Sequence, residues 1–239
     1  MASASGKEER GLVVVTGASK GIGRSTALEL AHAHHMHVLG ISRDAQGLAR
    51  LVEEGEGRIR GLALDITEDD APRRIAAAIG EEPVRAVIHN AGLLHKAGIG
   101  EHDAAGLERC FRLNAIAPLL ITQALLPRLA ATTGSHVVHI GSMGGFQDSA
   151  KFPGLVGYSA SKAALACMAQ CLAEDLKPYG IRSNCLALGS ADTEMLRAAF
   201  PGYQASMSAE SMARFVAWFA LNGHNQFNGR VLPVSLSTP

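Results

Sequence analysis

The chain has no excess of charge of either sign, because 22 Lys and Arg residues balance 22 Asp and Glu residues among its 239 positions. A nucleic-acid-binding surface usually shows a basic stripe or patch, and a helix that lies on a membrane shows a basic amphipathic face. Neither pattern occurs, so we expect no nucleic-acid partner and no membrane partner. The longest unbroken apolar runs also fall short of the roughly 18–20 residues that span a bilayer.

Cysteine is scarce and shows no paired pattern. The four cysteines include no CxxC pair, and two of them, Cys167 and Cys171, recur four positions apart in an apolar helical pattern. Cysteine at such positions usually behaves as a small buried hydrophobe. Residues 1–10 are small and polar and lack the apolar region of a signal peptide, so we expect a short disordered tail there. These features favour a reducing, cytoplasmic location.

Four histidines cluster at His32, His34, His35 and His37. The cluster lies where a helical pattern gives way to a strand pattern, and no partnering carboxylate or cysteine stands beside it. A specific zinc site combines several such ligands in a fixed spacing. We therefore predict no metal site.

Apolar runs rich in Val, Ile and Leu alternate with helical patterns along the chain. We expect strands at about 12–16, 37–41, 59–64, 84–89, 136–140, 181–188 and 230–234. Helices are expected at about 22–33, 46–54, 69–79, 107–131, 158–177 and 208–221. Such alternation produces right-handed βαβ units and a parallel sheet that is covered on both faces. The predicted fold is α/β, a single Rossmann-type doubly wound parallel sheet of about seven strands, in one domain over 11–239.

The first predicted strand runs directly into a glycine-rich segment, Thr16–Gly23, which is followed by a helix. Glycines allow a tight turn and a close approach of the backbone to a pyrophosphate, which the helix N-terminus then stabilises. The spacing is GxxxGxG, and its strand–loop–helix context indicates a dinucleotide site. The candidate cofactor-binding residues in this segment are Gly17, Ser19, Lys20, Gly21, Ile22 and Gly23.

The end of the second predicted strand indicates which dinucleotide binds. An NAD site places an Asp or Glu there, about 20 residues after the glycines, on the ribose 2′-hydroxyl. Here the strand ends in Ser42 and Arg43, so no carboxylate repels a 2′-phosphate and a guanidinium is available to bind it. Lys20 adds a second cation, and we expect NADP in preference to NAD. If the register is shifted by two residues, Asp44 takes the acidic position and NAD is expected instead.

Tyr158 and Lys162 are four positions apart in a helical pattern, so one turn places both on the same face, about 5–6 Å apart at Cβ. A free phenol has a pKa of about 10. An adjacent ammonium favours the phenolate and lowers that pKa. The pair is therefore a candidate proton donor for carbonyl reduction near neutral pH. Taken alone, the same spacing also occurs on ordinary helix surfaces.

Over about 12–234 the chain resembles a short-chain dehydrogenase/reductase of the single-domain, 3-oxoacyl-carrier-protein-reductase-like type. Several motifs occur in the family's order, and together they are far more specific than any one alone. They are TGASKGIG at 16–23, LDIT at 64–67, NAG at 90–92, an asparagine at 114, a serine at 142 and YxxxK at 158–162. The resemblance implies an oxidoreductase that transfers a hydride between NADP and a small carbonyl or secondary-alcohol substrate.

The resemblance also implies cofactor contacts. Asp65, next to Ile66, would accept a hydrogen bond from the adenine amino group, and Thr193 would bond the nicotinamide carboxamide. The positions expected beside the ribose or facing the nicotinamide are Asn90, Ala91, Gly92, Tyr158, Lys162 and Gly189.

The family's catalytic roles fall on four residues. Tyr158 would donate a proton to the substrate oxygen, and Ser142 would hold that oxygen by a hydrogen bond. Lys162 would bind the nicotinamide ribose and lower the pKa of Tyr158. Asn114 would bend its helix and hold a water that relays protons from Lys162 to solvent.

Three departures from the family's pattern concern the substrate side. Ser142 and Tyr158 are separated by extra residues, which form a loop at 147–155. The family's Pro-Gly after the sixth strand is Leu188-Gly189 here, which leaves cofactor orientation less fixed. The lid segment, 193–208, is short, which indicates an open or small-substrate pocket. No charged cluster points to a phosphate or an acyl carrier, although three cations are candidates: Lys151, Arg197 and Arg214.

Two further expectations concern assembly and class. The predicted helices at 107–131 and 158–177 carry more apolar residues than one core face uses, including Leu165 and Cys171, so we expect a homodimer or homotetramer through them. The alternative is that the loop around 146–155 covers this surplus. A catalytically silent NADP-binding sensor or scaffold remains the alternative to an enzyme, although such a protein has no need of Ser142 and Tyr158.

Overall fold

The computed structural model describes residues 11–236, and the predicted tail at 1–10 lies outside the described residues, as do 237–239. Seven parallel strands form the central sheet in the order β3-β2-β1-β4-β5-β6-β9, which confirms the predicted doubly wound α/β fold. The strands are β1 (Leu12–Thr16), β2 (Val38–Ser42), β3 (Ile59–Ala63), β4 (Val84–His89), β5 (His136–Ile140), β6 (Arg182–Leu188) and β9 (Val231–Val234).

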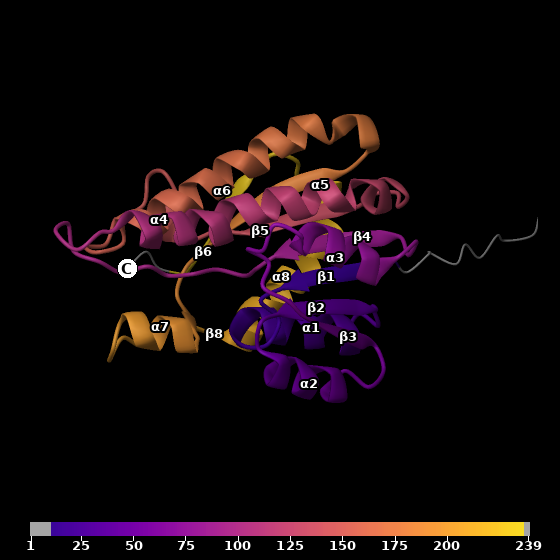
Figure 1. Cartoon of the computed structure of the whole chain (residues 1–239), viewed down its shortest axis with the longest axis horizontal. Helices are drawn as coiled ribbons and strands as arrows, with labels where there is room; N and C mark the ends of the chain where they lie inside the picture. The colour runs from indigo at the N-terminus through magenta and orange to yellow at the C-terminus, as the bar shows by residue number, and fades with distance from the viewer. Residues whose placement is uncertain (1–10, 237–239) are drawn as a thin grey trace, which may run out of the picture.

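Helices cover both faces of the sheet (Figure 1). One face packs against α1 (Gly21–His32), α2 (Ala45–Glu54) and α8 (Ala209–Asn222), and the other against α3 (Ala71–Ile79), α5 (Ala117–Ala130) and α6 (Val156–Asp175). Alternate residues of each central strand supply the two cores. In β1, Val13 and Val15 serve one core and Leu12 and Val14 the other, and all four are fully buried. Burial on both faces explains why the strands read as continuous apolar runs.

The strand order creates a crevice at the carboxyl end of the sheet. β1 lies between β2 and β4, so the chain builds outward to β3 and then crosses back to β4. The loops after β1 and β4 therefore diverge from each other. In open α/β sheets this switch point is where ligands bind. The glycine-rich segment follows β1 and the NAG segment follows β4, so both lie at the switch point.

The segment after β6 forms a small unit that the sequence did not predict. It contains the two-residue strands β7 (Ala191–Asp192) and β8 (Met207–Ser208), which pair in parallel, and the short helix α7 (Glu194–Ala199) between them. Figure 1 shows α7 standing apart from the central sheet. Elements this short carry no readable periodicity, so the pattern of apolar residues could not reveal them.

The helix predicted at 107–131 begins earlier than expected and is interrupted near Asn114. It runs as α4 (Ala104–Phe111), a π-helical turn (Arg112–Ile116) and α5. The stretch Ala104–Ala130 is long and apolar enough to cross a bilayer by length and composition, although charged residues such as Glu108 and Arg112 interrupt its apolar run. Length and composition are weak evidence, because a buried core helix meets the same test. The residues of α5 that pack against the sheet have no exposed surface: Ile121, Leu125 and Leu129.

The predicted burial of Cys167 and Cys171 is wrong, because both side chains are exposed. α6 buries the side that carries Leu165, Ala169 and Leu172. With 3.6 residues per turn, Cys167 and Cys171 fall on the opposite side of the helix. The apolar residues on that side therefore face outward.

Candidate active site

The glycine-rich segment is shaped for close contact with a ligand. Gly17 has a φ of +70°, and a Cβ there would lie 2.9 Å from the Cα of Ala91. At Gly23 a Cβ would lie 2.4 Å from the carbonyl oxygen of Gly17, so neither position accepts a side chain. α1 begins after Lys20 with no side-chain cap and no acidic residue in its first turn. The amides of that turn are therefore left for an anion, as at phosphate-binding helix N-termini.

Asn90 holds the glycine-rich segment in this shape. Its side-chain amide donates to the carbonyl oxygens of Thr16 at 3.0 Å and Gly17 at 3.2 Å. The backbone amides of Asn90 and Ala91 both donate to the hydroxyl of Thr16, each at 3.1 Å. The loop after β4 thus fixes the loop after β1, and the side chain of Asn90 acts on the protein rather than being left for a ligand.

β2 ends at Ser42, as predicted, and Ser42 and Arg43 line the crevice. The hydroxyls of Ser42 and Ser19 share a hydrogen bond of 2.9 Å. Asp44 is engaged elsewhere, because its carboxylate caps α2 by accepting from the amide of Gly47 at 2.9 Å. The register that would place Asp44 in the acidic position is not the one that the structure adopts.

Arg43 and Asp65 form an ion pair at the edge of the crevice, with 3.4 Å between Nη1 and Oδ2. Asp65 also accepts from the backbone amide of Thr67 at 2.9 Å and from its hydroxyl at 2.7 Å. Burial acts to raise the pKa of Asp65, but the Thr67 hydrogen bonds and the Arg43 charge outweigh it and lower that pKa. The Arg43 side chain is 73% exposed, so this pair is weak and the guanidinium is free to turn to another anion.

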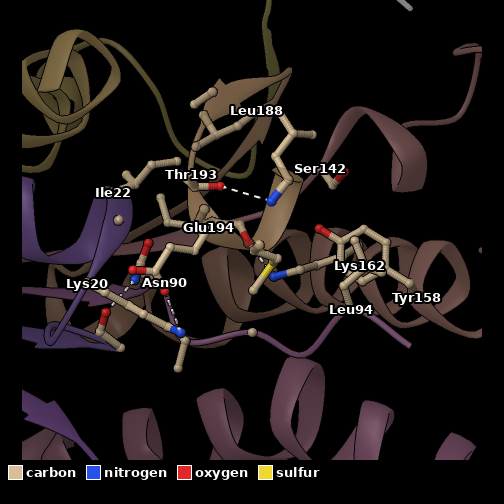
Figure 2. Close-up of a pocket in the computed structure, with 18 of the residues that line it drawn as sticks. Lys20, Ile22, Asn90, Leu94, Ser142, Tyr158, Lys162, Leu188, Thr193 and Glu194 are labelled. Atoms are coloured by element: carbon tan, nitrogen blue, oxygen red, sulfur yellow. Dashed lines mark hydrogen bonds and ion pairs between the residues drawn. The ribbon is translucent and has the colours of Figure 1, made fainter. Parts of the chain in front are cut away.

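Ser142, Tyr158 and Lys162 lie together at the other end of the crevice. Figure 2 shows them apart from Lys20 and Asn90, which lie at the glycine-rich end. Ser142 follows β5 and accepts a hydrogen bond from the backbone amide of Gly144 at 3.1 Å. Its hydroxyl acts on the nearby phenol of Tyr158, whose pKa it lowers. α6 brings Tyr158 and Lys162 to this point on one face, as their spacing predicts.

The expected effect of Lys162 on Tyr158 is wrong for this structure. Burial raises the pKa of the Tyr158 phenol above its ordinary value, the hydrogen bond with Ser142 opposes that rise, and Cys110 adds to it. The Lys162 ammonium donates instead to the carbonyl oxygen of Ile140, at 2.7 Å. Burial lowers the pKa of Lys162 to about 8. The phenol is therefore protonated at neutral pH and is able to donate.

Asn114 is fully buried in the π-helical turn between α4 and α5. Its side-chain oxygen accepts from the amide of Leu93 at 2.8 Å, and its side-chain nitrogen donates to the Leu93 carbonyl and the Ser161 hydroxyl, both at 2.9 Å. The expected irregularity in the long helix is therefore present, and π-turns often occur at functional sites. Asn114 ties this turn to α6, whereas its role in a proton relay stays a prediction.

The crevice has a cavity volume of about 420 Å³. Asn114 and Gly23 do not line it: Gly23 lies behind the Asn90 amide, and Asn114 behind Gly92. All the other predicted site residues do line it: Gly17, Ser19, Lys20, Gly21, Ile22, Ser42, Arg43, Asp65, Ile66, Asn90, Ala91, Gly92, Ser142, Tyr158, Lys162, Gly189 and Thr193.

Sequence reasoning missed the residues that the lid segment and the loop at 147–155 bring to the crevice. Glu194, the first residue of α7, forms an ion pair of 3.1 Å with Lys20. Three aromatic side chains also line the crevice: Phe152, Phe200 and Tyr203. The sequence offered one signal for them: these three aromatic residues lie close to the motifs along a chain in which only 5% of residues are aromatic.

Comparison with known proteins places these motifs in a family. Residues 11–204 match the family model described as short chain dehydrogenase. The rhamnolipid-biosynthesis 3-oxoacyl-acyl-carrier-protein reductase of Pseudomonas aeruginosa is 31% identical, over 78% of this chain and 75% of that protein. The very-long-chain 3-oxoacyl-CoA reductase of Meyerozyma guilliermondii is 33% identical over 70% of the chain, which spans about half (52%) of that relative's length.

A solved structure agrees with these matches. The Pseudomonas aeruginosa RhlG/NADP active-site complex is 26% identical with a TM-score of 0.84, over 98% of this chain and 96% of that one. The chain therefore belongs to the short-chain dehydrogenase/reductase family.

Proposed function

We propose that this chain is an NADP-dependent oxidoreductase that reduces a carbonyl compound, with Tyr158 as the proton donor. The observation that carries the proposal is that Ser142, Tyr158 and Lys162 meet at one end of a crevice whose other end is the glycine-rich segment. The two relatives described above are named as reductases of 3-oxoacyl compounds, which supports a carbonyl group as the reacting centre.

The residues present fit a nicotinamide dinucleotide. The uncapped first turn of α1 and the side-chain-free backbone at Gly17 suit a pyrophosphate. Asp65 and Ile66 would hold the adenine, and Lys162 would bind the nicotinamide ribose. When bound, the cofactor supplies the hydride that the carbonyl carbon receives.

The choice of NADP over NAD rests on Arg43, Ser42 and Asp44. Arg43 lines the crevice and is held there by a weak, exposed ion pair with Asp65, so its guanidinium is available to a 2′-phosphate. Ser42 contributes no charge, and Asp44 is engaged as the cap of α2. Lys20 would add a second cation after it leaves Glu194, to which it is bound by an exposed pair.

Proton transfer is the task of the chain's own residues. Ser142 would hold the substrate oxygen while Tyr158 gives its phenolic proton to that oxygen, and the carbonyl becomes a secondary alcohol. Burial raises the pKa of Tyr158, so the phenol carries its proton at neutral pH. Lys162, with a pKa of about 8, is charged at neutral pH and is able to return a proton to the phenolate. Asn114 would hold the water that connects Lys162 with solvent.

A panel of aldehydes and ketones, each followed by loss of NADPH absorbance, tests the proposal. We expect at least one carbonyl compound to be reduced, with NADH a poorer reductant than NADPH. The alternative is an NADP-binding sensor or scaffold without chemistry. Tight NADPH binding with no turnover across the whole panel would favour that alternative.

We also propose that the protein is a homodimer or homotetramer. Ile116 and Leu119 are 41% and 38% exposed, and Cys167 and Cys171 are exposed on α6. The loop at 146–155 leaves all four uncovered, so the apolar surplus on these helices faces outward. A second copy of the chain would cover it.

A further inference from the structure

The end of the crevice around Tyr158 is walled by apolar side chains. They come from the loops after β4 and β5, from the loop at 147–155 and from the lid segment: Leu94, Met143, Phe152, Leu155, Phe200 and Tyr203. We call these six residues the apolar wall. Figure 2 shows Leu94 beside Tyr158 and Lys162.

The charged residues that line the crevice stand at its opposite end. Among the described lining residues, Lys20 pairs with Glu194 at 3.1 Å and Arg43 pairs with Asp65 at 3.4 Å. Lys162 is a charged residue that does lie beside Tyr158. Its ammonium is buried and donates a hydrogen bond to the Ile140 carbonyl. No further charged side chain of the described residues lines the wall.

The cations that sequence analysis considered for an anionic substrate do not reach the crevice. Lys151 donates to the hydroxyl of Ser149 at 2.9 Å and to carbonyl oxygens of its own loop. Arg197 forms an ion pair with Asp192. Arg214 lies on α8, and none of the three lines the crevice. A carboxylate, sulfonate or phosphate inside the wall would therefore lose its hydration and gain no partner.

The apolar wall is held together by specific contacts. The rings of Phe152 and Phe200 meet edge to face, with centroids 6.0 Å apart and an interplanar angle of 65°. The ammonium of Lys96 lies 5.0 Å over the Phe200 ring and donates to the carbonyl oxygen of Ala199 at 2.8 Å. The amide of Ala97 donates to the carbonyl of Gly154 at 2.9 Å. The loop after β4 thus fixes both Phe152's segment and the end of α7.

We propose that the carbonyl substrate carries an uncharged hydrocarbon body, aromatic or alicyclic, that packs against Phe152, Phe200 and Leu94. Lys96 is a positioning residue, because it holds Phe200 and the end of α7 without lining the crevice. Aromatic rings favour edge-to-face and offset contacts with another ring, and the Phe152–Phe200 pair presents such a surface. This inference rests on the proposed reductase function.

Two ketones of similar shape test the substrate class: 4-ethylacetophenone, which is neutral, and 4-acetylbenzoate, which is anionic. With saturating NADPH we expect kcat/KM to be about 100-fold higher or more for the neutral ketone, because the anion would be buried without a partner. Equal values, or a preference for the anion, would overturn the proposal. Calorimetric titration of each ketone into the protein with NADP present gives a second readout that needs no turnover.

The binding readout separates the two proposals. Binding of the neutral ketone alone, without any turnover, would support the apolar substrate class and count against the reductase function. Turnover of charged carbonyl compounds in preference to neutral ones would support the reductase function and overturn the apolar class. Failure of both ketones to bind, while charged carbonyls bind, would likewise overturn it.

Variants test the wall itself. Phe152→Arg places a cation in the wall and should raise the ratio of kcat/KM for the anion to that for the neutral ketone about 10-fold or more. Lys96→Met should raise KM for the neutral ketone about 5-fold with kcat nearly unchanged. Lys96→Arg should bring KM most of the way back to the wild-type value, since arginine keeps the cation over the ring. Lys151→Met is the matched control and should leave the ratio unchanged.

Either of two results would contradict the role of the wall. One is an unchanged selectivity ratio in Phe152→Arg, with the melting temperature near that of the wild type. The other is a Lys96→Arg variant as impaired as Lys96→Met, which would mean that the cation over Phe200 does not position the ring.

Discussion

The ammonium of Lys162 and the carbonyl oxygen of Ile140 lie 2.7 Å apart, in a site where Lys162 is only 4% exposed. The contact joins α6 to the end of β5, next to Ser142. A buried ammonium loses hydration, and one hydrogen bond does not restore it. The lowered pKa of Lys162, about 8, records this cost. Lys162, the residue proposed to bind the nicotinamide ribose and to deliver protons, is thus held at the expense of stability.

Lys162→Met should therefore stabilise the protein in the absence of cofactor. The folded pKa of Lys162 is about 8 against an ordinary value of 10.5, so the unfolded chain binds the extra proton between those two pH values. Stability of the wild type accordingly rises with pH across that window, and the penalty is greatest below pH 8. We expect the variant to gain about 1–2 kcal/mol at pH 7, after the lost hydrogen bond is allowed for.

The measurement is the free energy of unfolding by urea for both proteins, at pH 7 and near pH 10. The advantage of Lys162→Met should shrink as pH rises. Lys177→Met, at an exposed lysine just beyond α6, serves as control and should show no such trend. A Lys162→Met variant that loses stability equally at both pH values would contradict the account.

Arg43→Ala should weaken NADPH binding about 10-fold or more and leave NADH binding nearly unchanged, since only NADPH carries the 2′-phosphate. Arg50→Ala, an exposed arginine on α2 that does not line the crevice, is the matched control. Isothermal titration with both cofactors measures the effect. Equal losses for NADPH and NADH, or none for either, would remove Arg43 from cofactor choice.

Acid should destabilise the protein through its buried histidines. Burial lowers the pKa of His89 and of His136 to about 3, whereas the ordinary value is 6.5. The unfolded chain therefore binds more protons between pH 6.5 and pH 3, and stability falls as pH falls through that window. Each histidine contributes at most about 1.4 kcal/mol per pH unit.

Urea unfolding at pH 7.5 and pH 5 measures this slope. His89→Gln removes one titrating ring, so its stability should fall less between the two pH values than that of the wild type. His37→Gln, at an exposed position, should keep the wild-type slope. An unchanged slope in His89→Gln would rule out this histidine as a source of acid sensitivity.

Light scattering at micromolar concentration should give a mass of at least twice the 25.0 kDa of the monomer. Leu119→Asp or Cys171→Asp should reduce that mass, because both positions are exposed on the outward faces of α5 and α6. Leu165, which the apolar pattern also suggested for the interface, is only 1% exposed and belongs to the core, so it is unsuitable for this test. A monomeric wild type would contradict the proposed assembly.

The sheet and the glycine-rich segment could be predicted because their signals are local. Strands such as β1 read as continuous apolar runs when both faces are covered. Positions 17 and 23 require glycine, because a Cβ at either position would clash with neighbouring backbone atoms. The sequence left the end of β2 open between Ser42 and Asp44; in the structure β2 ends at Ser42 and Asp44 caps α2.

Other features depend on the assembled fold. The apolar pattern of α6 could not tell which side faces the sheet, so the exposure of Cys167 and Cys171 was missed. The pKa of Tyr158 depends on burial and on the direction of the Lys162 ammonium, which spacing alone does not give. The contacts of Phe200 and Lys96 join segments about a hundred positions apart, where no sequence period operates.

Tyr158→Phe tests the central claim most directly, because it removes the transferable proton and leaves the ring in place. On a ketone that the wild type reduces, we expect kcat to fall by about 10²–10⁴-fold, the usual contribution of a positioned proton donor, while the NADPH dissociation constant stays within about twofold. Tyr179→Phe, at an exposed tyrosine beyond α6, should retain wild-type turnover. Near-wild-type turnover by Tyr158→Phe would contradict the assignment of Tyr158 as the proton donor.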